Sequence, residues 1–329
     1  MRNMRRWPVV LLLAAVLFAC SRAGGTPGGL PGVSPGGLPE EDQTDIVGAG
    51  VVYRLGDTDV TLRVPASTEV AVEEHNVIRV HIREDEAGDV DLSGLGALSD
   101  AFRLTLTAEG NMDALILPPN IAGTVIEAGT IRALDASRCR LARPLELRCH
   151  VEEADMPPTL EAITVSDDSL FRFPAMPRLY HVGFLHPVDL SPLAGLFLTE
   201  EQRVVRVTRS PEDGPWDLSP LADADITLLQ LGNTITQEEA DTLNGGTFTG
   251  LEMSDEVIRS LAFLDRLPAV SSLLLTVKGE QPEEVLPYLS TMTPCPADVF
   301  DALDTEVPRD ELAAFAERGD VYLFFEARR

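Results

Sequence analysis

Asp-Leu-Ser-Pro-Leu occurs twice in this chain, at 189–193 and at 217–221. A third copy, Asp91-Leu92-Ser93-Gly94-Leu95, differs at one residue, and Ser260-Leu261-Ala262-Phe263-Leu264 is a looser fourth. Each copy leads after a short gap into a pair of alternating apolar residues, which are Leu104 and Leu106, Val205 and Val207, Leu229 and Leu231, and Leu273 and Leu275. A unit that recurs at such spacing predicts a solenoid, in which each strand packs only on its neighbours.

Longer segments around these copies follow the pattern L-x-x-L-x-L-x-x-N/C-x-L. Ile131-x-x-Leu134-x-Ala136-x-x-Cys139-x-Leu141 fits it throughout, and Met112-x-x-Leu115-x-Leu117-x-x-Asn120 fits through its Asn. The segments at 160–170 and 248–258 keep the apolar residues but lose the Asn. The chain therefore resembles leucine-rich repeats, particularly the bacterial internalin-like type. The resemblance implies an α/β fold, an irregular solenoid of short parallel strands; the alternative is an ordinary α/β domain with coincidental leucines.

The fourth apolar position of each repeat sets the expected spacing. It falls at 115, 134, 163, 182, 205, 229, 251 and 273, so most steps lie within the family's range of about 20 to 29 residues. The expected solenoid spans 89–280, after an N-terminal β cap at 46–88 with strands at 51–55, 60–64 and 77–82. A C-terminal cap follows at 281–329, with helices at 283–290, 297–303 and 309–318 and a strand at 321–325.

The N-terminus has the composition of a processed leader. Three arginines precede a short apolar run from Trp7 to Phe18, and Leu17-Phe18-Ala19-Cys20 ends it. The run is too short to span a hydrocarbon core of about 30 Å. It resembles a bacterial lipoprotein signal peptide over 1–19, which implies that Cys20 becomes the lipidated N-terminus; an uncleaved anchor or a buried helix is the alternative.

Residues 20–45 read as a tether, because Gly-Gly and Pro recur there without apolar periodicity. A flexible coil of that length has a mean reach of roughly 28 Å. Ser21 follows the cysteine, and the lipoprotein resemblance then implies the outer membrane of a Gram-negative envelope. In a Gram-positive cell it implies the outer face of the cytoplasmic membrane.

The composition of the body excludes several classes of partner. The chain has 329 residues, 44% of them hydrophobic, with 26 Lys+Arg against 53 Asp+Glu and a net charge of -27. Removal of Arg2, Arg5 and Arg6 with the leader makes this -30. Such a charge repels nucleic acid and anionic head groups, so we expect no nucleic-acid partner and a membrane contact through the lipid alone.

Signatures of catalysis are missing from the sequence. It contains no Walker A motif, no H-E-x-x-H and no G-x-S-x-G. His75 and His81 would share a strand face but lack a convincing third ligand, and the D-x-D pairs (Asp57/Asp59, Asp89/Asp91, Asp223/Asp225) lack the rest of a calcium loop. We therefore expect no enzyme activity, no cofactor and no metal, with solvated histidines and capping aspartates instead.

Three cysteines remain beyond Cys20: Cys139, Cys149 and Cys295. In an oxidising compartment, Cys139 and Cys149 are candidates for a disulfide, with Cys295 left free. The repeat pattern offers the other interpretation, in which Cys139 is a buried thiol in the Asn/Cys position.

The concave face of the expected solenoid is the candidate binding surface. Its middle file would be Ile116, Asp135, Thr164, Gly183, Arg206, Gln230, Glu252 and Leu274, flanked by His181 and other residues. We take Asp135, His181, Arg206, Gln230 and Glu252 as candidate binding residues. The sequence predicts a lipid-anchored scaffold that binds a protein or glycan. The alternatives are a structural or envelope-assembly lipoprotein without a concave-face ligand, and, with the weakest support, a periplasmic hydrolase.

Overall fold

The computed structural model describes residues 50–73, 76–141, 144–197, 202–278, 280–288, 299, 302–318 and 322–328. The chain divides into two compact units, and all of these residues belong to the second, Gly50–Arg329. The expected leader, Cys20 and the tether lie outside the described residues, as do His75 and Cys295.

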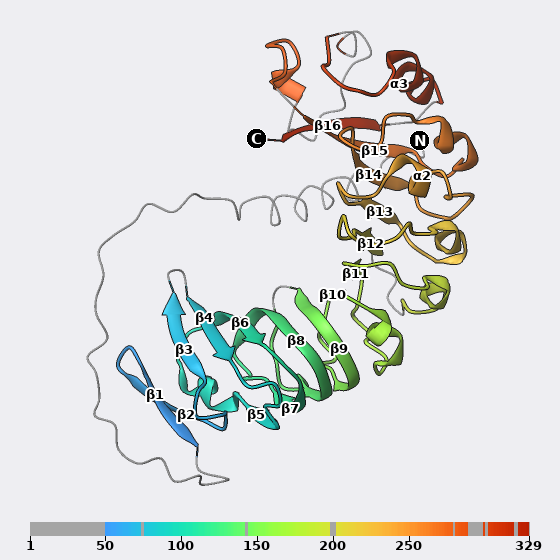
Figure 1. Ribbon diagram of the computed structural model, residues 1–329. Coiled ribbons are helices and arrows are strands. Elements are labelled where there is room, and N and C mark those ends of the chain that lie inside the picture. Colours follow the sequence, from blue (N-terminus) through green and yellow to red (C-terminus); the bar gives the residue numbers. More distant parts are fainter. Residues whose placement is uncertain are drawn as a thin grey trace, which may run out of the picture. The chain divides into compact units, whose positions relative to one another are not determined.

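A 14-stranded sheet forms most of the described chain (Figure 1). All of its strand pairs are parallel except β3 with β4, which is antiparallel. Its strands are β3 (Glu69–Glu73), β4 (Val77–Ile82), β5 (Asp89–Asp91), β6 (Phe102–Ala108), β7 (Met112–Ile116), β8 (Ile121–Asp135), β9 (Leu145–Asp155), β10 (Ala162–Val165), β11 (His181–Phe184), β12 (Val204–Val207), β13 (Leu228–Leu231), β14 (Gly250–Ser254), β15 (Ser272–Lys278) and β16 (Tyr322–Arg328).

Two of the three strands expected near the N-terminus have the predicted bounds. β1 (Val51–Leu55) pairs with β2 (Thr58–Leu62) in a separate antiparallel hairpin, so the strand expected at 60–64 begins two residues earlier. β4 coincides with the run expected at 77–82 and pairs in parallel with β6. The parallel ladder therefore begins at β4, within the segment expected as a cap.

From β10 onward the strands align as the repeat spacing predicts. Ile163, Val182, Val205, Leu229, Leu251 and Leu273 are successive partners across the ladder. Every one of them is buried, and so is the residue two positions later in each strand. One face of each short strand therefore covers the apolar residues of its neighbours, which is how strands of four to seven residues obtain a shared core.

The same alignment is wrong before β10. Leu115 does pair with Leu134, but the next partner of Leu134 is Ala154, whereas Ile163 pairs with Leu145. The reason is that β8 and β9 are long strands with a register shift between Glu127 and Thr130. The residues before the shift form one row of paired residues across the sheet, and the residues after it form a second row. The expected step of 29 residues thus joined positions from different rows.

Short 3-10 helices follow many of the strands. They are η1 (Ser93–Ala97), η2 (Asp168–Arg172), η3 (Ser191–Leu193), η4 (Ser219–Asp223), η5 (Ala262–Arg266) and η6 (Leu286–Tyr288); the α-helices are α2 (Gln237–Ala240) and α3 (Arg309–Ala316). Between β11 and β15 these helices lie in a column beside the strands (Figure 1).

The Asp-Leu-Ser copies form the turns that start these helices. The carboxylate of Asp91, Asp189 or Asp217 accepts a hydrogen bond of 2.9 Å from the backbone N–H of the serine two residues later. The final leucine of each copy is buried. Proline fits in η3 and η4 because the first N–H groups of a helix have no partner within it.

The C-terminal segment matches the expectation in part. α3 and β16 lie where a helix and a closing strand were predicted, and β16 extends the sheet by pairing in parallel with β15. The helix expected at 283–290 is wrong: the described part forms turns and η6. Pro287 explains this, because its ring clashes with the carbonyl four residues earlier in an α-helix. The helix expected at 297–303 lies largely outside the described residues.

Among the described residues, no helix combines the length and apolar composition needed to span a membrane.

Candidate functional site

Three of the candidate binding residues lie side by side on the sheet. Arg206, Gln230 and Glu252 are successive partners across β12, β13 and β14. The side-chain amide Nε2 of Gln230 donates a hydrogen bond of 2.7 Å to Oε2 of Glu252. Gln230 is 7% exposed, whereas Arg206 is exposed. We call Thr164, Gly183, Arg206, Gln230, Glu252 and Leu274 the outer file; they are in register across β10 to β15.

His181 lies beside this file rather than in it. It begins β11 and pairs with Val204 of β12. Burial, together with the positive charge of Arg206, lowers the pKa of His181 to about 4. The imidazole is therefore neutral at neutral pH and offers one donor and one acceptor.

Asp135 does not belong to this surface. It ends β8 in the second row of pairing, with Ile116 and Asp155 as partners. Its carboxylate accepts hydrogen bonds from the backbone N–H and the hydroxyl of Ser137, at 3.0 and 2.7 Å. Asp135 thus caps a turn as Asp91, Asp189 and Asp217 do, and Ile116 is likewise outside the outer file.

A groove of about 530 Å³ lies near the carboxyl ends of several strands. Ser166, Leu185 and Thr208 directly follow β10, β11 and β12, and Glu127 and Arg148 are partners where β8 and β9 bend. We call this the strand-end groove; its lining is Glu127, Arg148, Ser166, Leu185, His186, Thr208, Arg209 and Ser210.

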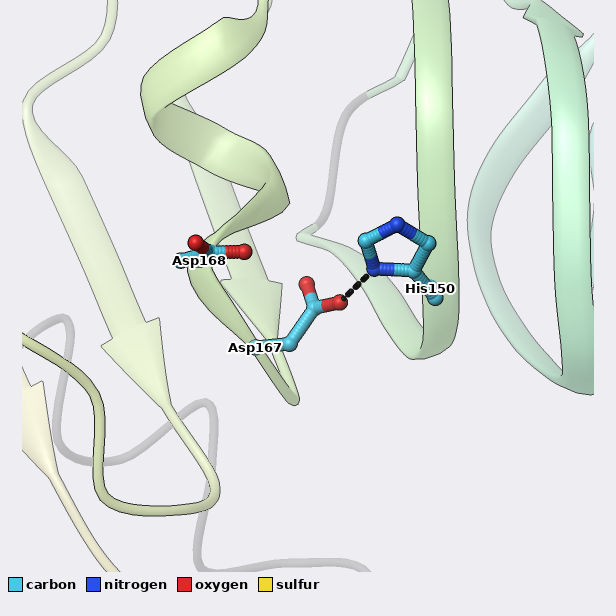
Figure 2. A group of neighbouring side chains, drawn as sticks. All are labelled: His150, Asp167 and Asp168. Atoms are coloured by element: carbon cyan, nitrogen blue, oxygen red, sulfur yellow. Dashed lines mark hydrogen bonds and ion pairs between the residues drawn. The ribbon is translucent and has the colours of Figure 1, made fainter.

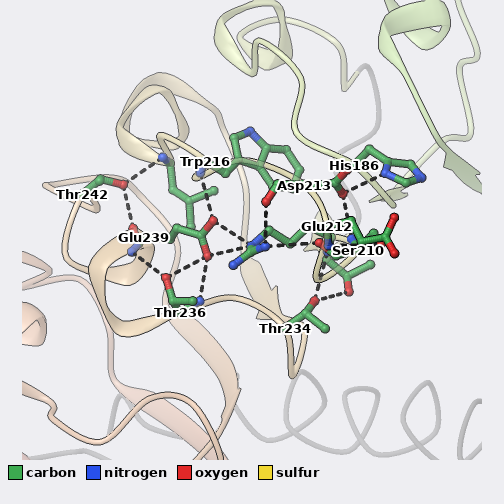
Figure 3. A network of polar contacts seen from close by, with 12 residues as sticks. His186, Ser210, Glu212, Asp213, Trp216, Thr234, Thr236, Glu239 and Thr242 are labelled. Carbon is green, nitrogen blue, oxygen red and sulfur yellow. Dashed lines mark hydrogen bonds and ion pairs between the residues drawn. The ribbon is translucent and has the colours of Figure 1, made fainter.

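One wall of the strand-end groove is a braced loop (Figure 3). Oδ2 of Asp213 lies 2.8 Å from Nδ1 of His186 and accepts a 2.7 Å hydrogen bond from the N–H of Ser210. Arg209 donates to the carbonyl groups of Ser210 and Asp213, at 3.1 Å each. The loop at 209–213 therefore closes on itself and holds His186 at its edge.

Arg209 ties this loop to the next turn of the chain. Its Nε lies 2.9 Å from Oε1 of Glu239 in α2, and the two side chains are 13% and 2% exposed. The Glu239 carboxylate also accepts hydrogen bonds from the N–H groups of Trp216 and Thr236, at 2.9 and 2.7 Å. Because all of these polar groups are paired, the wall is rigid.

The groove is lined by several hydrogen-bonding groups. The hydroxyl of Ser166 donates to the carbonyl of Cys149, and that of Ser210 accepts from the N–H of Glu212, each at 3.5 Å. Arg148 donates to Glu146 at 2.6 Å. No hydrogen bond joins either serine to His186 within the described residues.

The strand-end groove was not predicted from the sequence, although the sequence carries a signal for it. A small hydroxyl residue stands three positions after the inward residue of several repeats, at Ser166, Thr208, Ser254 and Thr276. The register places the first two of these at the groove. The contribution of Glu127, Arg148 and His186 has no sequence signal, because it depends on the bend in β8 and β9.

The histidines and D-x-D pairs have the following contacts. Nε2 of His81 lies 3.5 Å from Oε1 of Glu109. Asp59 lies 3.9 Å from Arg54, Asp91 accepts a hydrogen bond from the N–H of Ser93 at the start of η1, and Asp225 pairs with Arg203. His150 contacts Asp167, which no sequence pattern had indicated.

Cys139 and Cys149 are both free and buried, so the disulfide considered for them is wrong. Sγ of Cys139 instead donates to the carbonyl of Pro118 at 3.4 Å. Burial, together with the negative charge of a nearby aspartate, raises the pKa of each thiol to about 12. The structure favours the alternative, a buried thiol in the repeat.

Comparison with known proteins finds no matching family model, no matching curated protein and no matching solved structure.

Proposed function

We propose that this protein is a lipid-anchored, extracytoplasmic leucine-rich-repeat protein that binds a protein or glycan partner without catalysing a reaction. In this proposal the parallel ladder is a solenoid and the strand-end groove is its principal ligand site. Cys20 carries the lipid in the cell envelope, in the outer membrane of a Gram-negative cell or on the outer face of a Gram-positive membrane.

The ladder from β10 to β15 supports the solenoid. Its aligned inward residues are separated by 19 to 24 positions, as in 163 to 182 and 205 to 229, close to the leucine-rich-repeat range of about 20 to 29. Each repeat supplies one short strand and most supply one short helix. The two-row pairing before β10 is a departure from the family pattern.

The strand-end groove is the observation that carries the binding function. Its volume falls within the range of about 300 to 1,000 Å³ that is usual for ligand pockets. Hydroxyl, imidazole, guanidinium and carboxylate groups line it; Arg148, Arg209 and His186 have acidic partners, and Glu127 adds a further acceptor. A site with many hydrogen-bond donors and acceptors suits a hydroxyl-rich ligand, which favours a glycan.

The net charge agrees with a body that stands away from the membrane. At -27, the chain is repelled by anionic head groups. A lipid at Cys20 followed by about 25 tether residues then places the groove within reach of envelope glycans or proteins.

A glycan array tests the groove directly. The full chain in detergent is applied to envelope glycans, together with Ser166→Ala and Thr208→Val, which remove a hydroxyl with little change in shape. We expect each variant to weaken binding at least about tenfold, which corresponds to about 1.4 kcal/mol. Thr61→Val, on the separate hairpin, is the matched control and should bind as the parent does. Equal binding by all three variants, or no bound glycan, would contradict the glycan assignment.

The outer file is tested by capture of protein partners. The triple variant Arg206→Ala, Gln230→Ala and Glu252→Ala should lose a partner that the parent protein retains after crosslinking in cells. If the triple variant retains every partner, the outer file is not the contact surface. Incorporation of a labelled fatty acid into the parent but not into Cys20→Ser tests the anchor.

A further inference from the structure

A second cluster of side chains lies where β9 meets η2 (Figure 2). His150 is on β9, Asp167 is the N-cap of η2, and Asp168 is the first residue of that helix. One ligand atom from each residue lies within 4.8 Å of the other two. Among the described residues, this is the one group of at least three histidine, cysteine or acidic side chains so arranged.

Hydrogen bonds hold one oxygen of each carboxylate. Oδ1 of Asp167 accepts from the N–H of Ser169 at 2.9 Å and from its hydroxyl, while Oδ2 contacts Nδ1 of His150. Oδ1 of Asp168 accepts from Arg172 at 2.7 Å. Such supporting contacts are characteristic of metal ligands. Among the described residues, no hydrogen bond reaches the second oxygen of Asp168, and Asp168 lies in the same group of ligand atoms.

We propose that His150, Asp167 and Asp168 bind a divalent transition-metal ion, of which Zn²⁺ is the representative. One imidazole nitrogen and two carboxylate oxygens are ligands of zinc, whereas Ca²⁺ and Mg²⁺ are bound by oxygen alone. Two carboxylates also balance the charge of the ion. The side chains of His150 and Asp168 are 39% and 64% exposed, which leaves space for water as the fourth ligand.

The His186–Asp213 pair provides an internal comparison. It has the same Nδ1-to-Oδ2 contact, at 2.8 Å, and a similarly exposed histidine. No third ligand residue joins it within the described part of the chain. A histidine–aspartate contact is therefore common to both places, but the third ligand exists only at His150.

Zinc titration of the full chain tests the proposal. The protein is prepared in detergent without a polyhistidine tag, its accessible thiols are blocked with N-ethylmaleimide, and Zn²⁺ is titrated against a chromogenic chelator at neutral pH. We expect one bound ion that excess Ca²⁺ or Mg²⁺ does not displace. His150→Ala should weaken the affinity at least about tenfold. Asp168→Asn should do the same without unfolding the protein, because Asp168 is exposed and its substitution preserves size.

His186→Ala is the matched control and should retain the zinc affinity of the parent. Thermal unfolding with and without Zn²⁺ gives a second measurement, since an ion that binds the native state raises its melting temperature. The rise should vanish in His150→Ala and Asp168→Asn. The proposal is overturned if the parent binds no zinc, if neither substitution changes the affinity, or if His186→Ala costs as much as His150→Ala.

Discussion

Arg209, directly after Thr208, forms an ion pair with Glu239 of α2 in which Nε lies 2.9 Å from Oε1 and Glu239 is 2% exposed. The two residues are 30 positions apart, and their contact holds one wall of the strand-end groove against the next turn of the ladder. Since Glu239 also accepts from two backbone N–H groups, the pair belongs to a network that spans both turns.

Breaking this pair should destabilise the protein strongly. Arg209→Met leaves Glu239 buried without its cation, which costs about 3 to 5 kcal/mol in comparable cases. Arg132→Ala removes the exposed pair with Asp113, whose side chains are 69% and 57% exposed, and should cost less than about 1 kcal/mol. Urea unfolding measures both. Similar losses in the two variants would show that burial of the Arg209–Glu239 pair has no energetic consequence.

Thr124→Val should stabilise the protein. Thr124 is 3% exposed, occupies an inward position between Leu104 and Leu145, and its hydroxyl has no hydrogen-bond partner in the described structure. Replacing the hydroxyl with a methyl group removes the cost of that buried polar atom, for a gain of about 1 kcal/mol. Thr105→Val, on the outward side of β6, should change stability by less than about 0.5 kcal/mol. A loss of unfolding free energy in Thr124→Val would contradict the prediction.

Stability should fall in mild acid because of His181. Burial and Arg206 lower the pKa of His181 to about 4, below its ordinary value of 6.5. As the pH falls, the unfolded chain therefore binds a proton at His181 before the folded protein does. The stability that depends on neutral His181 is complete above about pH 6.5 and is lost as the pH falls to about 4. The full loss is about 3 kcal/mol. Unfolding free energies across this range should show a reduced slope in His181→Asn.

Arg206→Met sharpens the same test. Removing the positive charge raises the pKa of His181 toward 6.5. The loss of unfolding free energy should then begin at a similar pH as the solution is acidified, but the total loss should be smaller. An unchanged pH profile in both variants would mean that other groups control acid stability.

The Cys139 thiol should resist alkylation in the native protein. Thiolate is the reactive form, and burial raises the pKa of this thiol to about 12. Iodoacetamide should label Cys139 only after denaturation, as followed by mass spectrometry of its peptide. Labelling at the same rate in native and denatured protein would contradict the buried position.

Local patterns were predictable from the sequence because their contacts are local. The carboxylate of Asp189 reaches the N–H of Ser191 two residues later, and Val205 and Val207 share a face because side chains alternate along a strand. α3 was also predictable from its composition. The described part of the segment expected as a helix at 283–290 forms turns and η6 instead, because Pro287 is not compatible with the interior of an α-helix.

The outer file was predictable in the same way from β10 onward. Each segment there contributes one strand, so residues at equivalent positions of successive segments become partners in the sheet. Asp135 was misplaced because a bulge moves β8 from one row of pairing to another. A bulge shifts every later residue relative to its partner, and the repeat pattern carries no sign of it.

By itself the sequence determined the strand-and-turn segments and their inward apolar residues, since these follow from contacts between near neighbours. The tertiary structure decided which residues share a site. It brings Arg148, Ser166, His186 and Arg209 to one groove, and His150 to Asp167 and Asp168. The physical reason is that lateral pairing of parallel strands sets these contacts, and its register depends on bends and bulges that no single segment encodes.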